Sequence, residues 1–365
     1  MDENFALILL SRCKGLGPIL TKSAINRFGS AKAVLEQKPI ELKHQCGWSP
    51  LQIAELKQSE KSDHAVACRD LEYLKKNNIE IISFKSNAYP LRLKQIVDAP
   101  TFLYVKGNID LNPSRTLAIV GTRKPRAQSL VLTQQFIEDA QNHGVQIISG
   151  LAYGIDICAH KNAIKCDVPN IGVLAHGLDQ IYPKAHYKTS SEIQKNGALI
   201  SEMPLFTNLH PDLFPRRNRI IAGMSDAVVV VESKTVGGSM STAQIARSYD
   251  RDVFAFPEIP IKGNNSGCNA LIKRQVAELI EDFSDVCKSM NWSIKQRNTP
   301  QYNLFPNLTT DEQQLLQTLT GKRMHIDELI QYSKLPLHTI TLCVLELELK
   351  GIIQVLPGKY YQRIA

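Results

Sequence analysis

Short apolar runs alternate regularly with amphipathic segments along the middle of the chain, and this alternation most constrains how the chain can fold. The runs are apolar along their whole length, as strands are when helices cover both faces of a sheet. Segments with helical spacing, about 10–15 residues long, separate them. We expect strands at Leu117–Val120, Val145–Ser149, Ile171–Leu174, Ala198–Ser201, Ala227–Val231 and Val253–Phe256. The pattern predicts an α/β fold with a doubly wound parallel sheet.

A smaller region precedes the predicted sheet in the sequence, and another follows it. Residues 1–60 have the spacing of short helices, and Gly15–Pro18 interrupts them as in a helix-hairpin-helix motif. A small helical packing module whose turn needs glycine explains the same residues. Beyond a polar stretch, three helical segments and a hairpin around Pro357–Lys359 predict a winged helix. We set the boundaries at residues 1–70, 71–288, 289–302 (linker) and 303–365.

Composition excludes several classes of protein. The longest apolar runs are too short to span a bilayer, and no secretory signal follows the polar start of the chain, so we expect a cytoplasmic protein with no membrane partner. The 8 cysteines form no C-x-x-C pair, and we expect no metal site. The net charge of +8 makes a polyanionic partner reasonable.

Small and basic residues gather where the predicted strands end. In a parallel α/β sheet the ligand lies beyond the carboxyl ends of the strands. The segments there are Gly121–Lys124, Gly150–Gly154, Tyr182–Lys184, Phe214–Arg219 and Gly237–Ser239. Glycine is common at any strand–helix turn, but the cations on the same edge favour a site for an anion.

Motifs for familiar cofactors and reactions are missing from the sequence. No G-x-G-x-x-G follows the first strand, and no P-loop, H-E-x-x-H or G-x-S-x-G motif occurs. We therefore expect no cofactor and no catalytic residue.

Six ordered motifs resemble those of the DNA-processing protein DprA family, also called Smf. The resemblance covers about residues 80–285. The motifs are Ala118–Arg123, Ile148–Asp156 with Ala159-His160, Gly177–Pro183, Phe214–Gly223 and Gly237–Ala243. It implies an extended Rossmann-type core that binds single-stranded DNA, forms homodimers and passes the strand to the RecA recombinase. In that family this protects incoming DNA during natural transformation, and no enzymatic activity is implied.

The resemblance also assigns roles to individual residues. Arg123 and Lys184 would hold the phosphate backbone, and Phe214 would stack on a base unless it packs in the core. The helix that follows Phe214 would contact phosphate or fix its own loop. His160 and Asp156 are expected to fix their loop rather than transfer protons. The DNA-binding residues that the resemblance implies are Gly121, Thr122, Arg123, Lys184, Phe214, Arg217, Asn218, Arg219, Gly238, Ser239 and Thr242.

Two places depart from the family pattern, and two alternative functions remain. Glu258 and Gln275-Val276 replace residues usual in the family, which puts the last loop of the core in question rather than the DNA pocket. An enzyme resembling the lysine-decarboxylase-like phosphoribohydrolases is disfavoured, because Gln244 stands where their glutamate would be. A transcription regulator is disfavoured because the presumed recognition helix, Leu337–Lys350, is leucine-rich and acidic.

Overall fold

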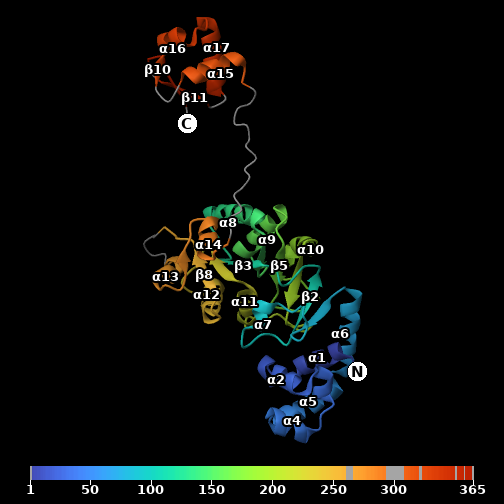
Figure 1. Ribbon diagram of the computed structural model, residues 1–365. Helices are drawn as coiled ribbons and strands as arrows, with labels where there is room; N and C mark the ends of the chain where they lie inside the picture. Colours follow the sequence, from blue (N-terminus) through green and yellow to red (C-terminus); the bar gives the residue numbers. More distant parts are fainter. Residues whose placement is uncertain are drawn as a thin grey trace. The chain divides into compact units, whose positions relative to one another are not determined.

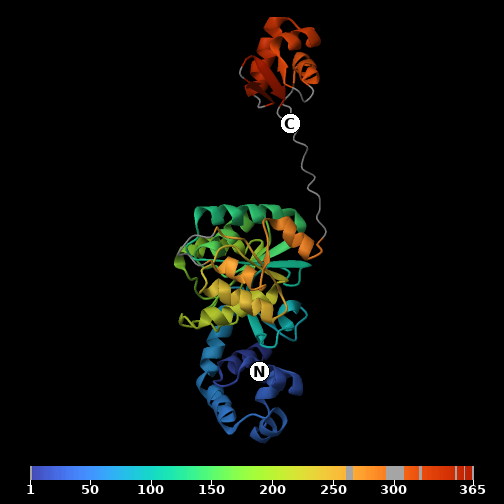
Figure 2. The same ribbon diagram turned by 90° about the vertical axis from the view of Figure 1, so that its left-hand side faces the viewer.

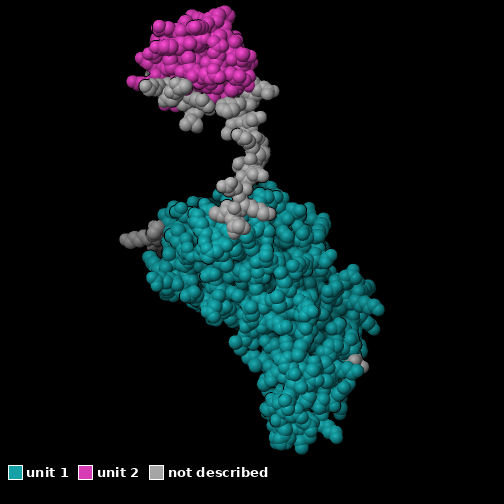
Figure 3. Space-filling model, viewed as in Figure 1, with its two compact units in different colours: residues 1–295 teal, residues 296–365 magenta. Residues whose placement is uncertain are grey.

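The computed structural model describes residues 2–259, 266–292, 308–319, 323–349, 352–356 and 358–363. The chain divides into two compact units, residues 1–295 and 296–365, shown in separate colours in Figure 3. No helix in the described part of the chain combines the length and the apolar character needed to cross a bilayer.

Six helices open the first unit. They are α1 (Glu3–Arg12), α2 (Pro18–Phe28), α3 (Ala31–Leu35), α4 (Pro39–Cys46), α5 (Pro50–Ser62) and α6 (His64–Lys76). Helix α1 is buried from Phe5 to Leu10 because α3, α5 and α6 pack around it. Gly29 ends α2 with a φ of 94°, which glycine adopts readily. At the start of α5, Ser49 and Gln52 form a reciprocal capping box.

A sheet of nine strands forms the centre of this unit (Figure 1). The strands are β1 (Glu80–Ser83), β2 (Phe102–Gly107), β3 (Arg115–Val120), β4 (Val145–Ser149), β5 (Asn170–Val173), β6 (Gly197–Ser201), β7 (Ala227–Val230), β8 (Asp252–Ala255) and β9 (Glu278–Leu279). Their order is β1-β2-β6-β5-β4-β3-β7-β8-β9. All neighbours from β6 to β9 are parallel, which confirms the predicted sheet. Strands β1 and β2 add an antiparallel edge, and β2 was not predicted.

Helices cover both faces of the sheet (Figures 1 and 2). One face carries α8 (Ala127–Ala140), α9 (Ile155–Lys165), α10 (Tyr187–Ile193) and α14 (Phe283–Ser289), and the other carries α7 (Leu91–Lys94), α11 (Leu213–Met224) and α12 (Gly238–Ser248). Helix α13 (Gly267–Lys273) packs against β8. Strand β3 shows why its run is apolar throughout. Leu117 and Ile119 pack in the core beneath α8, whereas Ala118 and Val120 pack in the core beneath α11.

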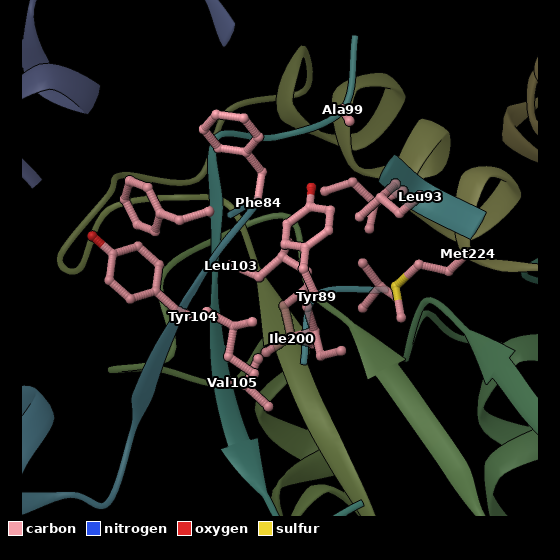
Figure 4. Packing of buried hydrophobic residues seen from close by; sticks show 14 of the residues in the cluster. Phe84, Tyr89, Leu93, Ala99, Leu103, Tyr104, Val105, Ile200 and Met224 are labelled. Carbon is pink, nitrogen blue, oxygen red and sulfur yellow. The ribbon is translucent and has the colours of Figure 1, made fainter. Parts of the chain in front are cut away.

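The segment between β1 and β2 anchors the antiparallel edge (Figure 4). Tyr89 is fully buried there, and its hydroxyl donates a hydrogen bond to the Pro100 carbonyl at 2.7 Å. Leu93 and Met224 lie beside it in the same apolar cluster, so the segment fills the space between the edge strands and α11. At the other end of the core, the Trp292 ring lies under the Arg115 guanidinium, and the predicted linker falls mostly outside the described residues.

The second unit has its own core. Its elements are α15 (Thr310–Thr318), β10 (Met324–His325), α16 (Ile326–Ser333), α17 (Leu337–Leu349), β11 (Ile353–Leu356) and β12 (Tyr360–Arg363). Three helices enclose Leu315, Leu329 and Ile340 beside a sheet of order β10-β12-β11. This confirms the winged helix. Pro357, expected in the hairpin turn, lies outside the described residues.

Candidate nucleic-acid interface

The strand order reverses next to β3. From β3 the chain proceeds through β4, β5 and β6 on one side, and then crosses to β7 and β8 on the other. Such a reversal opens a crevice at the carboxyl ends of the two strands that flank it. A hollow of about 320 Å³ lies there, between the loops that follow β3 and β7. We call it the sheet-edge hollow.

The sheet-edge hollow brings most of the expected DNA-binding residues together. Those that line it are Gly121, Thr122, Arg123, Phe214, Arg217, Asn218, Gly238, Ser239 and Thr242. Lys184 and Arg219 do not line it. Lys184 is exposed and begins a short 3-10 helix, Lys184–His186, directly after the cis Tyr182–Pro183 peptide bond.

The first turn of α12 forms one wall of this hollow. The unpaired amides at the start of a helix are a favourable place for an anion. The Thr242 hydroxyl and the Asn218 side-chain amide both donate to the Gly238 carbonyl, at 2.9 and 3.3 Å. The hydroxyls of Ser239 and Ser233 lie 2.8 Å apart. These side chains therefore fix the turn, whose residues Gly237, Gly238 and Ser239 line the hollow.

Phe214 stands between two other side chains that can hold a nucleotide. The Arg123 guanidinium carbon lies 5.3 Å from the Phe214 ring centroid. The Tyr182 ring meets Phe214 edge-on at 6.4 Å and is 45% exposed. Phe214 is only half-buried, so it belongs to the surface rather than to the core. Arg123, Phe214 and Tyr182 together form what we call the first aromatic cluster.

A narrow recess continues the sheet-edge hollow beyond Phe214. Both cavities share Arg123, Phe214 and Arg217, and the recess adds Tyr153, Tyr182 and Pro183. Tyr153 and Tyr182 were absent from the residues expected at the site. The signal for them was present, since each occupies a motif segment that ends a strand. Joined, the two cavities form a groove along the carboxyl edge of the sheet.

The Arg217 guanidinium forms the floor of the groove, where it is hydrogen-bonded to backbone carbonyls rather than exposed to a ligand. One of its guanidinium nitrogens donates to the Gly150 carbonyl at 2.5 Å and to the Val173 carbonyl at 2.6 Å. Burial lowers its pKa to about 10, although nearby Asp156 opposes this shift. These bonds hold together the carboxyl ends of β4 and β5. Arg217 is therefore a positioning residue.

Arg219 lies away from the groove. Its guanidinium forms an ion pair with Glu202 and donates to the Asp98 carbonyl. The Tyr249 hydroxyl reaches the Asp98 carboxylate at 2.6 Å. Arg219 thus ties α11 to the segment before β2, which is an architectural role and places it out of reach of a ligand in the groove.

The buried acid and histidine of the second motif also have structural partners. Burial raises the pKa of Asp156, whose carboxylate accepts from the Ala152 amide at 3.4 Å. His160 is fully buried beside the Asn170 side chain at 2.9 Å, and burial lowers its pKa to about 4. His160 therefore remains neutral at physiological pH. Among the described residues, no group of His, Cys, Asp or Glu side chains could hold a metal ion.

Glu258, one of the two departures from the family pattern, is connected to the groove after all. Its carboxylate binds the Arg126 guanidinium at 2.6 Å and accepts from the Ser233 amide at 3.3 Å. Arg126 also pairs with Glu232 at 3.1 Å. Ser233 lines the sheet-edge hollow and Glu258 does not, so this departure reaches the hollow through one hydrogen bond. At the other departure, Gln275 adopts a φ of 56° just after α13.

The surface of α17 differs from that of a helix that reads a DNA groove. Leu337, Leu342 and Leu345 are exposed and line a hollow of about 890 Å³ with Glu348. Leucines and an acid are unsuited to phosphate and base edges. The packing or protein-contact role expected for this helix stays a prediction.

Comparison with known proteins decides the family. A family model for DNA recombination-mediator protein A matches residues 80–291, and one for the DprA winged helix domain matches residues 300–359. The chain belongs to the DprA family. The Smf protein of Escherichia coli is 33% identical over 296 residues, which cover 79% of this chain and 78% of that protein.

Two solved DprA structures are similar as well. DNA processing protein A from Streptococcus pneumoniae superposes with a TM-score of 0.69 and 29% identity, covering 79% of this chain and 98% of that one. DNA processing protein A from Helicobacter pylori, described for its single-stranded DNA binding mode, gives a TM-score of 0.53 and 28% identity, with 58% and 95% covered. The resemblance inferred from the sequence is thus confirmed.

Proposed function

We propose that this protein binds single-stranded DNA in the groove at the carboxyl edge of its sheet. The observation that carries the proposal is the first aromatic cluster, in which Phe214 lies between Arg123 and Tyr182. An aromatic ring can stack on any base, and a neighbouring cation can hold the phosphate. The amides at the start of α12 provide a second place for a phosphate.

The groove is suited to an unpaired strand of any sequence. Stacking on Phe214 needs a base free of its partner, because a base inside a duplex already stacks on its neighbours on both faces. Lys184 follows the recess at Pro183 and would add a further phosphate contact. The DprA structure from Helicobacter pylori, with its single-stranded DNA binding mode, supports this choice of ligand.

The wider role that we propose follows from the family. The protein would protect incoming single-stranded DNA, load the RecA recombinase on it, and act as a cytoplasmic homodimer during DNA uptake and recombination. The description of the matching family as a recombination mediator supports this role. Loading is testable as a shorter lag in RecA-dependent ATP hydrolysis on a coated single strand.

A binding role explains the groove better than catalysis does. The phosphoribohydrolase alternative requires a carboxylate at position 244, but Gln244 is exposed and lines neither the sheet-edge hollow nor the recess. Asp156, the acid that lines the sheet-edge hollow, is buried beside Arg217 and contacts a backbone amide. We therefore propose that the protein is not an enzyme.

Fluorescence anisotropy with labelled oligo-dT and a duplex of equal length tests the proposal. Arg123→Ala and Lys184→Ala should each weaken binding to the single strand, while Arg247→Ala, which removes an exposed cation elsewhere on the sheet domain, should not. Binding only to the duplex, or binding that none of these substitutions changes, would contradict the assignment of the groove.

A further inference from the structure

A second hollow, of about 560 Å³, lies between the N-terminal helices and the sheet domain. Its walls come from α1, the turn that leads into α2, the loop after β6, and the first turn of α11. Figure 1 shows α11 on the side of the sheet that faces α1 and α2. We call this the interdomain hollow.

The first turn of α11 connects the two hollows. Phe214 and Arg217 line the sheet-edge hollow, whereas Leu213 and Arg216 line the interdomain hollow. Residues one position apart on a helix point about 100° apart, so the two pairs lie on different faces of this turn. Arg216 is therefore the cation that this turn presents to the interdomain hollow, next in sequence but one to Phe214.

The interdomain hollow offers two exposed cations. Lys14 and Arg216 both line it, both are exposed, and neither is in an ion pair with any described residue. Other charges in its walls have protein partners. Arg12 binds the buried Asp70 carboxylate at 2.5 Å, and Glu202 pairs with Arg219. Asp63, at the end of α5, is the remaining acid among the described lining residues.

An aromatic cluster at the rim of this hollow repeats the arrangement in the groove. The Arg69 guanidinium carbon lies 4.5 Å from the Phe206 ring centroid, and the Tyr73 ring meets Phe206 edge-on at 5.4 Å. Phe206 is 46% exposed, and its amide donates to the Asp179 carboxylate at 2.8 Å. The loop thus holds a partly exposed ring beside a cation and a second ring, as Phe214 is held beside Arg123 and Tyr182.

We infer that the interdomain hollow continues the path of single-stranded DNA. The groove would bind one stretch of nucleotides, and the strand would then pass Arg216, place a phosphate near Lys14 and stack a base at Phe206. This inference rests on the proposed function of the groove. It assigns a DNA-binding role to the N-terminal helices of the same chain.

A series of oligo-dT lengths separates the two sites. We would measure anisotropy with the full chain, from about 6 to about 30 nucleotides, over a range of salt concentrations. The test variant is Lys14→Ala with Arg216→Ala, and its control is Lys43→Ala with Arg247→Ala, which removes two exposed cations outside both hollows. Thermal unfolding shows whether each variant is folded.

The expected result depends on length. The test variant should match the wild type on the shortest oligonucleotide that binds, and should bind the longest about tenfold more weakly. Its slope of log K against log salt should decrease by about 1.4, since each single-strand phosphate contact contributes about 0.7. The control variant should behave as the wild type at every length.

A fluorescent probe locates the strand directly. Phe206→Trp should show emission that long oligonucleotides quench and the shortest do not, after subtraction of the signal from Trp48 and Trp292. Equal loss of affinity at all lengths, or none at any, would overturn the interdomain path while leaving the groove in place. If the wild type bound no oligonucleotide at all, the proposed function itself would fail, and this inference with it.

Discussion

The guanidinium of Arg217 occupies the space in which a side chain on Gly150 would begin. The same guanidinium donates a hydrogen bond to the Gly150 carbonyl at 2.5 Å. Glycine is thus required here by a close approach rather than by its backbone angles, and the two residues act as one unit. The carboxyl end of β4 is held in place by a charge from α11.

Gly150→Ala should disturb this unit. A methyl group would displace the Arg217 side chain, and overpacking of a filled interior costs about 1–3 kcal/mol. Both the free energy of unfolding in urea and the affinity for oligo-dT should fall. Gly144→Ala is a matched control for the added methyl group, because Gly144 has open space around its Cα although its φ of 62° adds some strain of its own. Unchanged DNA binding in Gly150→Ala would show that the groove does not depend on Arg217.

Arg123→Ala and Phe214→Leu should weaken DNA binding in different ways. Loss of Arg123 removes a phosphate contact, so the slope of log K against log salt should flatten by about 0.7. Loss of the Phe214 ring removes stacking worth about 1–3 kcal/mol but no charge, so affinity should fall with the slope unchanged. A salt series on both variants measures the difference. If Phe214→Leu changed stability but not binding, Phe214 would be a packing residue.

His160 should make stability depend on pH. Burial lowers the pKa of His160 from 6.5 to about 4 in the folded protein, so the unfolded chain binds the proton first as pH falls. The folded state should therefore lose on the order of 3 kcal/mol between pH 7 and pH 4 through this group. Urea unfolding of the wild type and His160→Gln measures the contribution as the difference between the two pH profiles. Parallel profiles would show that His160 does not contribute.

Glu258→Gln tests whether Glu258 positions the loop before α12, because the two possible roles of this carboxylate change the affinity for DNA in opposite directions. Removing a negative charge near the groove should strengthen DNA binding if only long-range electrostatics mattered. If Glu258 instead holds Arg126 and the Ser233 amide, the loop before α12 loosens and binding weakens. We expect weaker binding, by a fewfold in anisotropy. The control Glu281→Gln removes an exposed acid from the same unit and should bind as the wild type.

The sequence predicted the parallel strands because a strand buried on both faces leaves an uninterrupted apolar run. Strand β2, at Phe102–Gly107, has such a run too, but its antiparallel pairing with β1 and β6 depends on contacts between distant segments. A run of residues does not reveal that pairing. The antiparallel pairing was missed for this reason.

The candidate site was predicted from the rule that strand ends of a parallel sheet meet at one edge, and most of the expected residues do line the groove. Arg217 and Arg219 show the limit of that reasoning. Two residues apart on a helix, they point about 200° apart and reach opposite sides of α11. Whether Arg217 or Arg219 contacts a ligand or another part of the protein depends on what packs against each side of α11. The interdomain hollow was missed for a related reason, since it exists only where two regions pack together.

The bonds that Arg217 makes with the ends of β4 and β5 affect the thermodynamics of DNA binding. Both acceptors are backbone carbonyls of the protein itself, so the floor of the groove is preorganised. Binding then has to order the flexible strand and a few exposed side chains, but not the backbone beneath them. On the proposed function, the entropy lost on association therefore falls mainly on the DNA, and the surface beneath the strand keeps its shape.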